Sequence, residues 1–140
     1  MVIKFFFNNA SIKIPARKKL KQYITALFEK EGTVIFSLSY IFCSDKDLLS
    51  INKEFLGHHD YTDIITFTLS NPTEPIEGEI YISVDRIKDN AKKIGVNINE
   101  ELHRIIFHGA LHLCGYKDKI TGEKKEMTNA EDSYLNGYFR

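Results

Sequence analysis

The sequence predicts an α+β fold in which a roughly four-stranded mixed sheet packs with about five helices. Two patterns support this class. Apolar, β-branched segments of strand length occur at four places before residue 85, and apolar residues recur at helical spacing between and after them. The composition, 43% hydrophobic and 27% charged, is that of an ordinary globular protein. No repeat or linker divides the 140 residues, so we expect a single domain over residues 1–140.

Strands and helices are expected to alternate through the first half of the chain. The apolar, aromatic segment Val2–Phe7 is typical of a strand. Pro15 suits the first turn of a helix that ends at Gly32 and has apolar residues at helical spacing, namely Leu20, Ile24, Leu27 and Phe28. Residues 33–43 are β-branched and aromatic and predict a second strand. Ser44 then caps a short helix that includes Leu48, Leu49 and Phe55.

The second half begins with two further strands, at residues 63–69 and 79–84, separated by a loop that contains Asn71, Pro72 and Pro75. A helix follows and ends at Gly95. Asn97 caps the next helix, which we expect to be the buried central one because apolar residues cover much of its surface: Leu102, Ile105, Ile106, Ala110, Leu111 and Leu113. A last, charged helix starts at Thr121 and continues through Leu135.

Charge and cysteine content limit the function and the compartment. Lys+Arg and Asp+Glu both number 19, so the net charge is zero; this argues against a general nucleic-acid binder and requires any RNA contact to come from a local basic patch. Cys43 and Cys114 give no disulfide framework, and we expect a cytoplasmic protein without a disulfide partner. The N-terminus lacks the features of a signal peptide, and no apolar stretch approaches the roughly 20 residues of a membrane span.

The central helix ends in the most informative stretch of the chain, residues 108–118. His108 and His112 are separated by about 400° of helical rotation and roughly 6 Å of rise, so both imidazoles leave the same face. A left-handed residue at Gly115 would end the helix and turn the chain, so that Asp118 could bring a carboxylate back as a third ligand. Three protein ligands leave a fourth position open, as in catalytic zinc sites. The sequence therefore predicts one Zn²⁺ bound by His108, His112 and Asp118.

Other residues of this helix are weaker candidates. Cys114 lies about 240° round from His108 and is expected to be a small buried residue; a His-His-Cys site is the alternative if Asp118 is not a ligand. His103 lies about 140° from His108 and is expected to be exposed or capped. Zinc peptidases have a glutamate general base directly after the first histidine, whereas this chain has Gly109, which argues against proteolysis.

Three stretches of the chain resemble the YbeY family of metal-dependent endoribonucleases. Residues 108–116 match the family pattern His-Gly-x-Leu-His-Leu-x-Gly-Tyr. Residues 62–67, preceded by Asn52 and Gly57, are similar to the family's Thr-Asp-Val-Leu-Ser-Phe segment, and residues 78–83 are similar to its Gly-Asp-Ile-x-Ile-Ser strand. The resemblance implies a cytoplasmic enzyme with one zinc ion per chain that trims ribosomal RNA, notably at the 3′ end of the small-subunit 16S rRNA, and takes part in quality control of the 70S ribosome.

Two positions depart from the family pattern. The family usually has a histidine where this chain has Asp118; a carboxylate still binds zinc but makes the bound water less acidic. The family also usually has an arginine, implicated in RNA cleavage, where this chain has Leu56, and a leucine cannot hold a phosphate. Either activity is weak or another cation binds the RNA. The nearest candidates for that cation are His58, His59, Lys117 and Lys119. The alternative is that these four are ordinary surface residues.

Three hypotheses follow. The leading one is a zinc-dependent endoribonuclease specific for single strands, in which the metal-bound water is the catalytic group and Asp63 orients that water or a ligand imidazole; otherwise Asp63 only caps a loop. The second is a non-catalytic factor, associated with the small ribosomal subunit, whose metal is structural; Leu56 and the zero net charge motivate it. The third, a zinc peptidase, depends on the ligand spacing alone.

Overall fold

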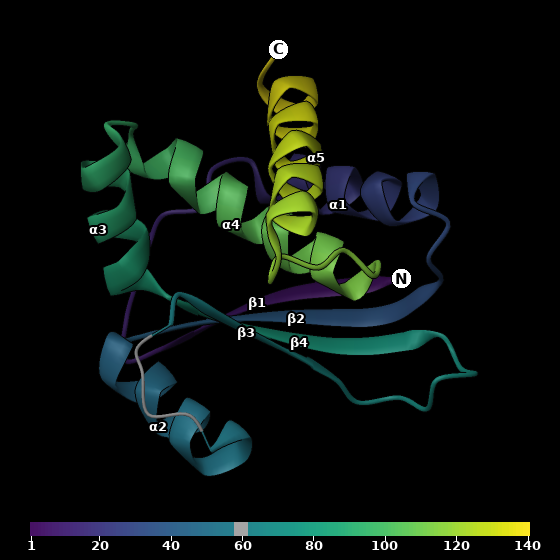
Figure 1. Ribbon diagram of the computed structural model, residues 1–140, viewed down its shortest axis with the longest axis horizontal. Helices are drawn as coiled ribbons and strands as arrows, with labels where there is room; N and C mark the ends of the chain where they lie inside the picture. The colour runs from purple at the N-terminus through teal and green to yellow at the C-terminus, as the bar shows by residue number, and fades with distance from the viewer. Residues whose placement is uncertain (58–61) are drawn as a thin grey trace.

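The computed structural model describes residues 1–57 and 62–140, so that two of the predicted RNA contacts, His58 and His59, lie outside the described residues. Along the chain the elements are β1 (Val2–Asn8), α1 (Arg17–Lys30), β2 (Ile35–Cys43), α2 (Asp45–Leu56), β3 (Ile64–Thr68), β4 (Ile76–Ser83), α3 (Val84–Ile94), α4 (Ile98–Leu113) and α5 (Thr121–Phe139). Figure 1 shows α1, α4 and α5 on one side of the sheet and α2 on the other.

The strands form one mixed sheet in the order β1-β2-β4-β3. Both β1 and β4 run parallel to β2, whereas β3 runs antiparallel to β4. The predicted α+β class, with a four-stranded mixed sheet and five helices, is therefore confirmed in the part of the chain that the structure describes. Several element ends differ from prediction by one or two residues, and three differences are more informative. Pro15 precedes the cap of α1 and lies outside its first turn, β4 starts already at Ile76 because Ile76 pairs with Ile35 of β2, and α5 reaches Phe139.

Most of the core lies between the sheet and the helices above it. The two-residue period of a strand directs alternate side chains of β2 and β4 toward α1 and α4, and each is at most 1% exposed: Leu38, Tyr40, Phe42, Ile80 and Ile82. Burial of each such side chain contributes about 1.5–3 kcal/mol. On the opposite face α2 covers a smaller cluster in which Leu48 packs with Cys43 and Ile65. The sheet thus provides a rigid base for α4.

A hydrogen bond and a glycine determine how closely α4 packs on the sheet. The Tyr40 hydroxyl donates a hydrogen bond of 2.9 Å to the carbonyl of Ile106. A Cβ atom at Gly109 would lie 2.9 Å from Ile64 Cδ1 and 3.0 Å from Ile80 Cδ1, closer than side chains normally approach. Because Gly109 has no side chain, α4 can come this close to β3 and β4, and the next residue toward its N-terminus, His108, lies near the start of β3.

The C-terminal helix α5 lies across α4 (Figure 1) and buries the side of α4 that includes His103. His103 is 1% exposed, its ring stacks on that of Tyr138 with centroids 5.1 Å apart, and its Nδ1 lies 2.6 Å from the carbonyl oxygen of Asn99. Of the two expectations for His103, exposed or capped, the first is wrong, because aromatic residues of α5 cover this face of α4, whereas the contact of Nδ1 with the Asn99 carbonyl agrees with the second.

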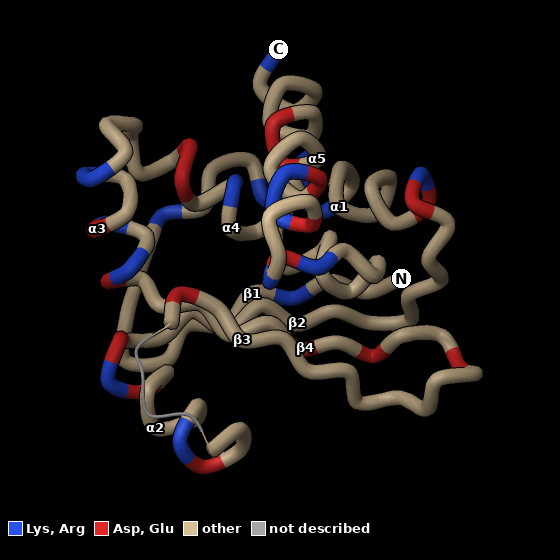
Figure 2. The backbone as a smooth tube through the Cα atoms, viewed as in Figure 1, with Lys and Arg blue, Asp and Glu red and all other residues tan. Residues whose placement is uncertain are grey.

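The distribution of charged residues and the state of the two cysteines agree with the expectations from composition. In Figure 2 basic and acidic residues are interspersed along the helices, in keeping with the zero net charge. Cys43 and Cys114 are both free thiols. Within residues 1–57 and 62–140, no helix combines the length and the apolar character that crossing a membrane requires.

Candidate metal centre

The end of α4 has the turn that the sequence predicts. Gly115 adopts φ 103°, in the left-handed region that favours glycine. The amide of Gly115 donates to the carbonyl of His112, and the amide of Tyr116 donates to that of Leu111, each at 3.0 Å. This pair of bonds is the Schellman motif, which satisfies the last carbonyls of a helix while it reverses the chain. The reversal returns Asp118 toward the helix face that it has just left.

Three side chains converge on one point beyond this turn. Asp118 Oδ2 lies 3.3 Å from His108 Nε2 and 3.4 Å from His112 Nε2. One nitrogen or oxygen atom from each of the three residues lies within 4.8 Å of the others, and the three side chains are partly buried. The two imidazole centroids are 4.6 Å apart, as their spacing on one helix face requires. The structure therefore brings together all three residues that the sequence proposes as ligands.

The separations suit a single tetrahedral ion. Two atoms bonded to one such ion at about 2.0–2.2 Å lie roughly 3.3–3.6 Å apart, because they form one edge of the coordination tetrahedron. The two separations from Asp118, 3.3 and 3.4 Å, fall in this range. Two imidazole nitrogens and one carboxylate oxygen are also a donor set that zinc accepts. The donor set and the two separations from Asp118 therefore fit a zinc ion.

Both imidazoles are oriented from behind by a hydrogen bond. His108 Nδ1 lies 2.5 Å from Glu131 Oε2, and His112 Nδ1 lies 3.0 Å from the carbonyl oxygen of Tyr116. A carboxylate and a carbonyl only accept, so each Nδ1 carries the proton and donates it. Each Nε2 is thereby left with its lone pair toward Asp118, which is the state that binds a metal. The turn that returns Asp118 also supplies the carbonyl that orients His112.

Sequence reasoning missed Glu131. Glu131 lies on α5, is 7% exposed, and accepts a 3.0 Å hydrogen bond at Oε1 from Arg104, whose guanidinium also donates to Asp132 at 2.9 Å. The only signal in the sequence is that an acid at position 131 interrupts the buried stripe of α5, which consists of Met127, Tyr134, Leu135 and Tyr138. An almost fully buried carboxylate on such a stripe needs partners, and here they are the Arg104 guanidinium and the His108 imidazole.

The electrostatics of the site couple these groups. Burial by itself would lower the pKa of His108, but the hydrogen bond and charge of Glu131, together with the charges of Asp118 and Asp63, outweigh it and raise that pKa. Burial also raises the pKa of the Asp63 carboxyl; the charge of His108 opposes this shift, and those of Asp118 and Glu131 add to it. Asp63 therefore belongs to the same electrostatic cluster, although it is not one of the three converging residues.

The remaining predicted residues are distributed around this cluster. The Cys114 thiol interacts with Thr33, outside the three-residue cluster, and burial raises its pKa to about 11. Lys117 is exposed. Lys119 is exposed as well and lines a cleft of about 390 Å³ between α2 and β3, together with Asn52, Leu56, Thr62, Ile64, Ile65 and Thr66. The cleft borders the residue after Asp63 and the residue after Asp118, so it adjoins the converging side chains.

Comparison with known proteins shows the family to which the chain belongs. The model of the family described as "Endoribonuclease YbeY" matches residues 5–138. The chain is 46% identical to the "Endoribonuclease YbeY" of Cytophaga hutchinsonii, over 95% of this chain and 93% of that protein. It is 39% identical to the protein of the same name from Parabacteroides distasonis, over 96% of this chain and 94% of that one.

A solved structure agrees in fold. The solution structure of TM1509 from Thermotoga maritima superimposes with a TM-score of 0.62 at 26% identity, over 99% of this chain and 89% of that chain. The family match extends over nearly all of the residues that form the sheet, the central helix and the three converging side chains. The chain belongs to the YbeY endoribonuclease family.

Proposed function

We propose that this protein is a zinc-dependent endoribonuclease that cleaves single-stranded RNA, with His108, His112 and Asp118 as the ligands of one zinc ion. The main support is the geometry of those three side chains, whose separations of 3.3 and 3.4 Å correspond to edges of a zinc tetrahedron. Membership of a family named for endoribonuclease activity supports the reaction. The proposed substrate is ribosomal RNA, at the 3′ end of 16S rRNA and in quality control of the 70S ribosome, in the cytoplasm.

The residues of the site have separate tasks in this proposal. Zinc, when bound, would polarise a phosphoryl oxygen and acidify a water molecule. Glu131 and the Tyr116 carbonyl keep the two imidazoles in the tautomer that binds metal. Asp63 orients the attacking water and accepts its proton on the carboxylate. Burial raises the pKa of Asp63 toward neutrality, which makes its carboxylate a better proton acceptor.

The cleft beside the site is the proposed path for RNA. Lys119 lines it directly after the ligand Asp118, and Leu56, at the position where the family usually has arginine, lines it as well. We propose that Lys119 supplies the positive charge that Leu56 lacks, as a single point charge on a phosphate in place of a bidentate arginine. The hydroxyl of Thr66, which also lines the cleft, adds a hydrogen-bonding group without sequence specificity.

The packing of Gly109 counts against the alternative of a zinc peptidase. The peptidase motif needs a glutamate directly after the first histidine. At Gly109 even a methyl group would meet Ile64 and Ile80 at 2.9–3.0 Å, so a glutamate there would be forced into the sheet. The position serves the packing of α4, and it offers no room for that general base.

The test combines metal content with RNA cleavage. Purified wild type should contain one zinc per chain by mass spectrometry and cleave single-stranded RNA faster than a fully paired duplex. His112→Ala should lose both the zinc and the cleavage. Lys117→Ala is the matched control for zinc content, because Lys117 is exposed and adjoins Asp118 without converging on the site. Cleavage by His112→Ala at the rate of wild type would refute the proposal.

A second candidate is a ribosome-associated factor without catalysis, whose metal is structural. The observation that favours it is Leu56, which is 43% exposed at a cleft position where a phosphate-binding arginine would be expected. In this case a chelator should lower the melting temperature strongly while no RNA cleavage is detectable at any zinc concentration. Loss of cleavage on chelation with an unchanged melting temperature would exclude this candidate and favour the enzyme.

A further inference from the structure

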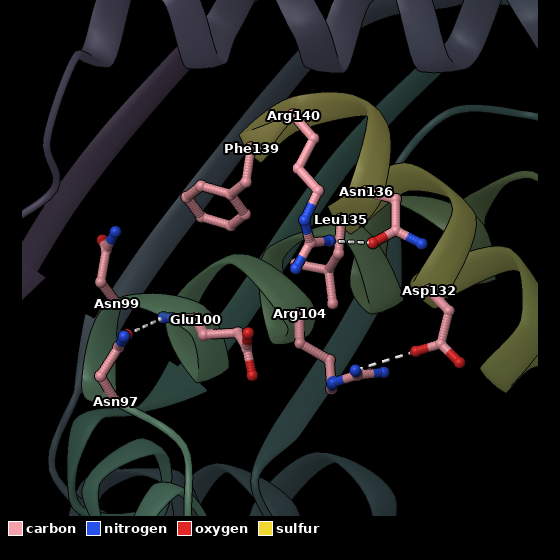
Figure 3. A pocket seen from close by; sticks show the side chains of 9 residues that line it. All are labelled: Asn97, Asn99, Glu100, Arg104, Asp132, Leu135, Asn136, Phe139 and Arg140. Carbon is pink, nitrogen blue, oxygen red and sulfur yellow. Dashed lines mark hydrogen bonds and ion pairs between the residues drawn. The ribbon is translucent and has the colours of Figure 1, made fainter.

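A second pocket lies between the first half of α4 and the end of α5, in the angle where the two helices cross (Figure 3). Its volume is about 390 Å³, within the range of small-ligand sites. Figure 3 shows α4 contributing the residues on one side and α5 those on the other. Its lining includes Asn99, Arg104, Asp132, Asn136 and Phe139.

The charges of the lining cancel. Arg104 donates to Asp132 at 2.9 Å, so the two form an ion pair at the wall of the pocket. Arg140 donates to the Asn136 side chain, and Glu100 adds a second acid to the lining. A phosphate would meet two acids beside the two cations, so a bare anion gains little here. The lining is suited to an uncharged ligand with both donors and acceptors.

Unsatisfied polar atoms gather at the same end of α4. Among the residues that the structure describes, three buried side-chain atoms have no hydrogen-bond partner: Asn99 Oδ1, Glu101 Oε1 and His103 Nε2. All three belong to the first two turns of α4, and Asn99 lines the pocket. Buried polar atoms are nearly always paired, so an unpaired group at a pocket indicates a partner that binds there. Asn99 Oδ1 is buried in the free protein, so an N–H group of a ligand would satisfy it once the amide turns toward the pocket that Asn99 lines.

An aromatic ring completes the lining. Phe139 is 43% exposed in the last turn of α5, and its ring is held by an edge contact with buried His103, with centroids 4.9 Å apart. A positioned, partly exposed ring next to amide groups is the combination by which proteins hold an unstacked nucleobase, with stacking on the ring and hydrogen bonds to the base edge. The uncharged, flat and polar ligand that the lining favours is therefore a base.

The pocket is connected to the metal centre. Arg104 lines the pocket and also donates to Glu131, which accepts from the His108 imidazole. Arg104 and His108 are one helical turn apart, roughly 6 Å along α4. A base held here would thus belong to a nucleotide close to the one at the three converging side chains. We propose that this pocket binds a splayed-out base of the single-stranded RNA substrate, an inference that builds on the proposed endoribonuclease function.

Binding of a non-cleavable RNA tests this directly. Fluorescence anisotropy would be measured with zinc-loaded protein and a single-stranded 2′-O-methyl oligonucleotide. Phe139→Ala should weaken binding roughly 5- to 150-fold, the range for loss of one base–aromatic stack. Asn99→Ala should weaken it about 2- to 10-fold, as for one hydrogen bond. Phe139→Tyr keeps the ring and should bind as wild type does. Phe36→Ala, which truncates a 61% exposed phenylalanine of β2, is the matched control without effect.

The outcomes separate this proposal from the one on which it depends. Equal affinity of wild type, Phe139→Ala and Asn99→Ala, with intact melting temperatures, would overturn the base pocket whether or not the enzyme cleaves RNA. If Phe139→Ala and Asn99→Ala weaken RNA binding but the wild type cleaves no RNA, the base-binding pocket is supported and the proposed endoribonuclease function is refuted. Adenosine monophosphate should not displace the oligonucleotide at comparable concentration; if it does, the pocket serves a free nucleotide, and the assignment to an RNA strand is wrong.

Discussion

Replacement of Glu131 by glutamine isolates the part of the metal centre that comes from α5. The variant keeps the size of the side chain but removes the charge that accepts from His108 Nδ1 at 2.5 Å and from Arg104 at 3.0 Å. A hydrogen bond to a charged group contributes about 1.5–3 kcal/mol. Loss of such a partner behind a metal-binding histidine typically weakens metal affinity about 10–100-fold, which corresponds to roughly 1.4–2.8 kcal/mol. The two ranges agree, so we expect Glu131→Gln to bind zinc 10–100-fold more weakly.

The assay is competition for zinc against a chromophoric chelator at fixed pH, with circular dichroism as a check on the fold. Asp132→Asn is the matched control. Asp132 is the next residue on α5 and bonds the same guanidinium at 2.9 Å, but its side chain is 52% exposed and does not reach His108. This variant should keep its zinc affinity within about twofold, because exposed ion pairs contribute little. Equal zinc affinity of Glu131→Gln and wild type would refute the role of α5 in the site.

Three further predictions concern other residues. Asp118→Ala should weaken zinc binding by at least about 10-fold while Asp118→His retains the metal, since imidazole is an equally good donor; loss of zinc from Cys114→Ala with none from Asp118→Ala would reassign the ligand. Gly109→Ala should destabilise the fold by about 1–3 kcal/mol in denaturant titration, because the added Cβ would lie 2.9 Å from Ile64. Gly122→Ala is the control and should not destabilise the fold, because a Cβ there meets open space. Equal effects of the two variants would disprove the role of Gly109 in packing. Burial raises the pKa of the Glu101 carboxyl to about 7, against the opposing charge of Arg104. Protonated Glu101 therefore contributes on the order of 3 kcal/mol to folding stability, a contribution that is complete below about pH 4.5 and lost as the pH rises through 7. Glu101→Gln should flatten this decline, and an unchanged slope of stability between about pH 5 and 8 would count against the prediction.

What the sequence alone determined about this protein is local in the chain. The α+β class followed from periods of two and of 3.6 residues, because these periods reflect backbone geometry within one element. The pairing of His108 with His112 followed from the pitch of a helix, and the turn at Gly115 from the conformation that glycine permits. All of these relations span fewer than about ten residues, so no knowledge of the packing was needed. The role of Asp118 depended on the same short turn.

The side chains that act on this local arrangement from elsewhere in the chain depend on tertiary packing. Glu131 is 23 residues from His108 along the chain, and it reaches the imidazole because α5 crosses α4. Asp63 enters the cluster because close packing at Gly109 sets α4 against the start of β3. His103, expected to be either exposed or capped, is buried by the same crossing of α5. Periodicity states which face of a helix is apolar but not which element covers it, and this choice depends on strand order and helix crossing, which are set by packing over the whole chain.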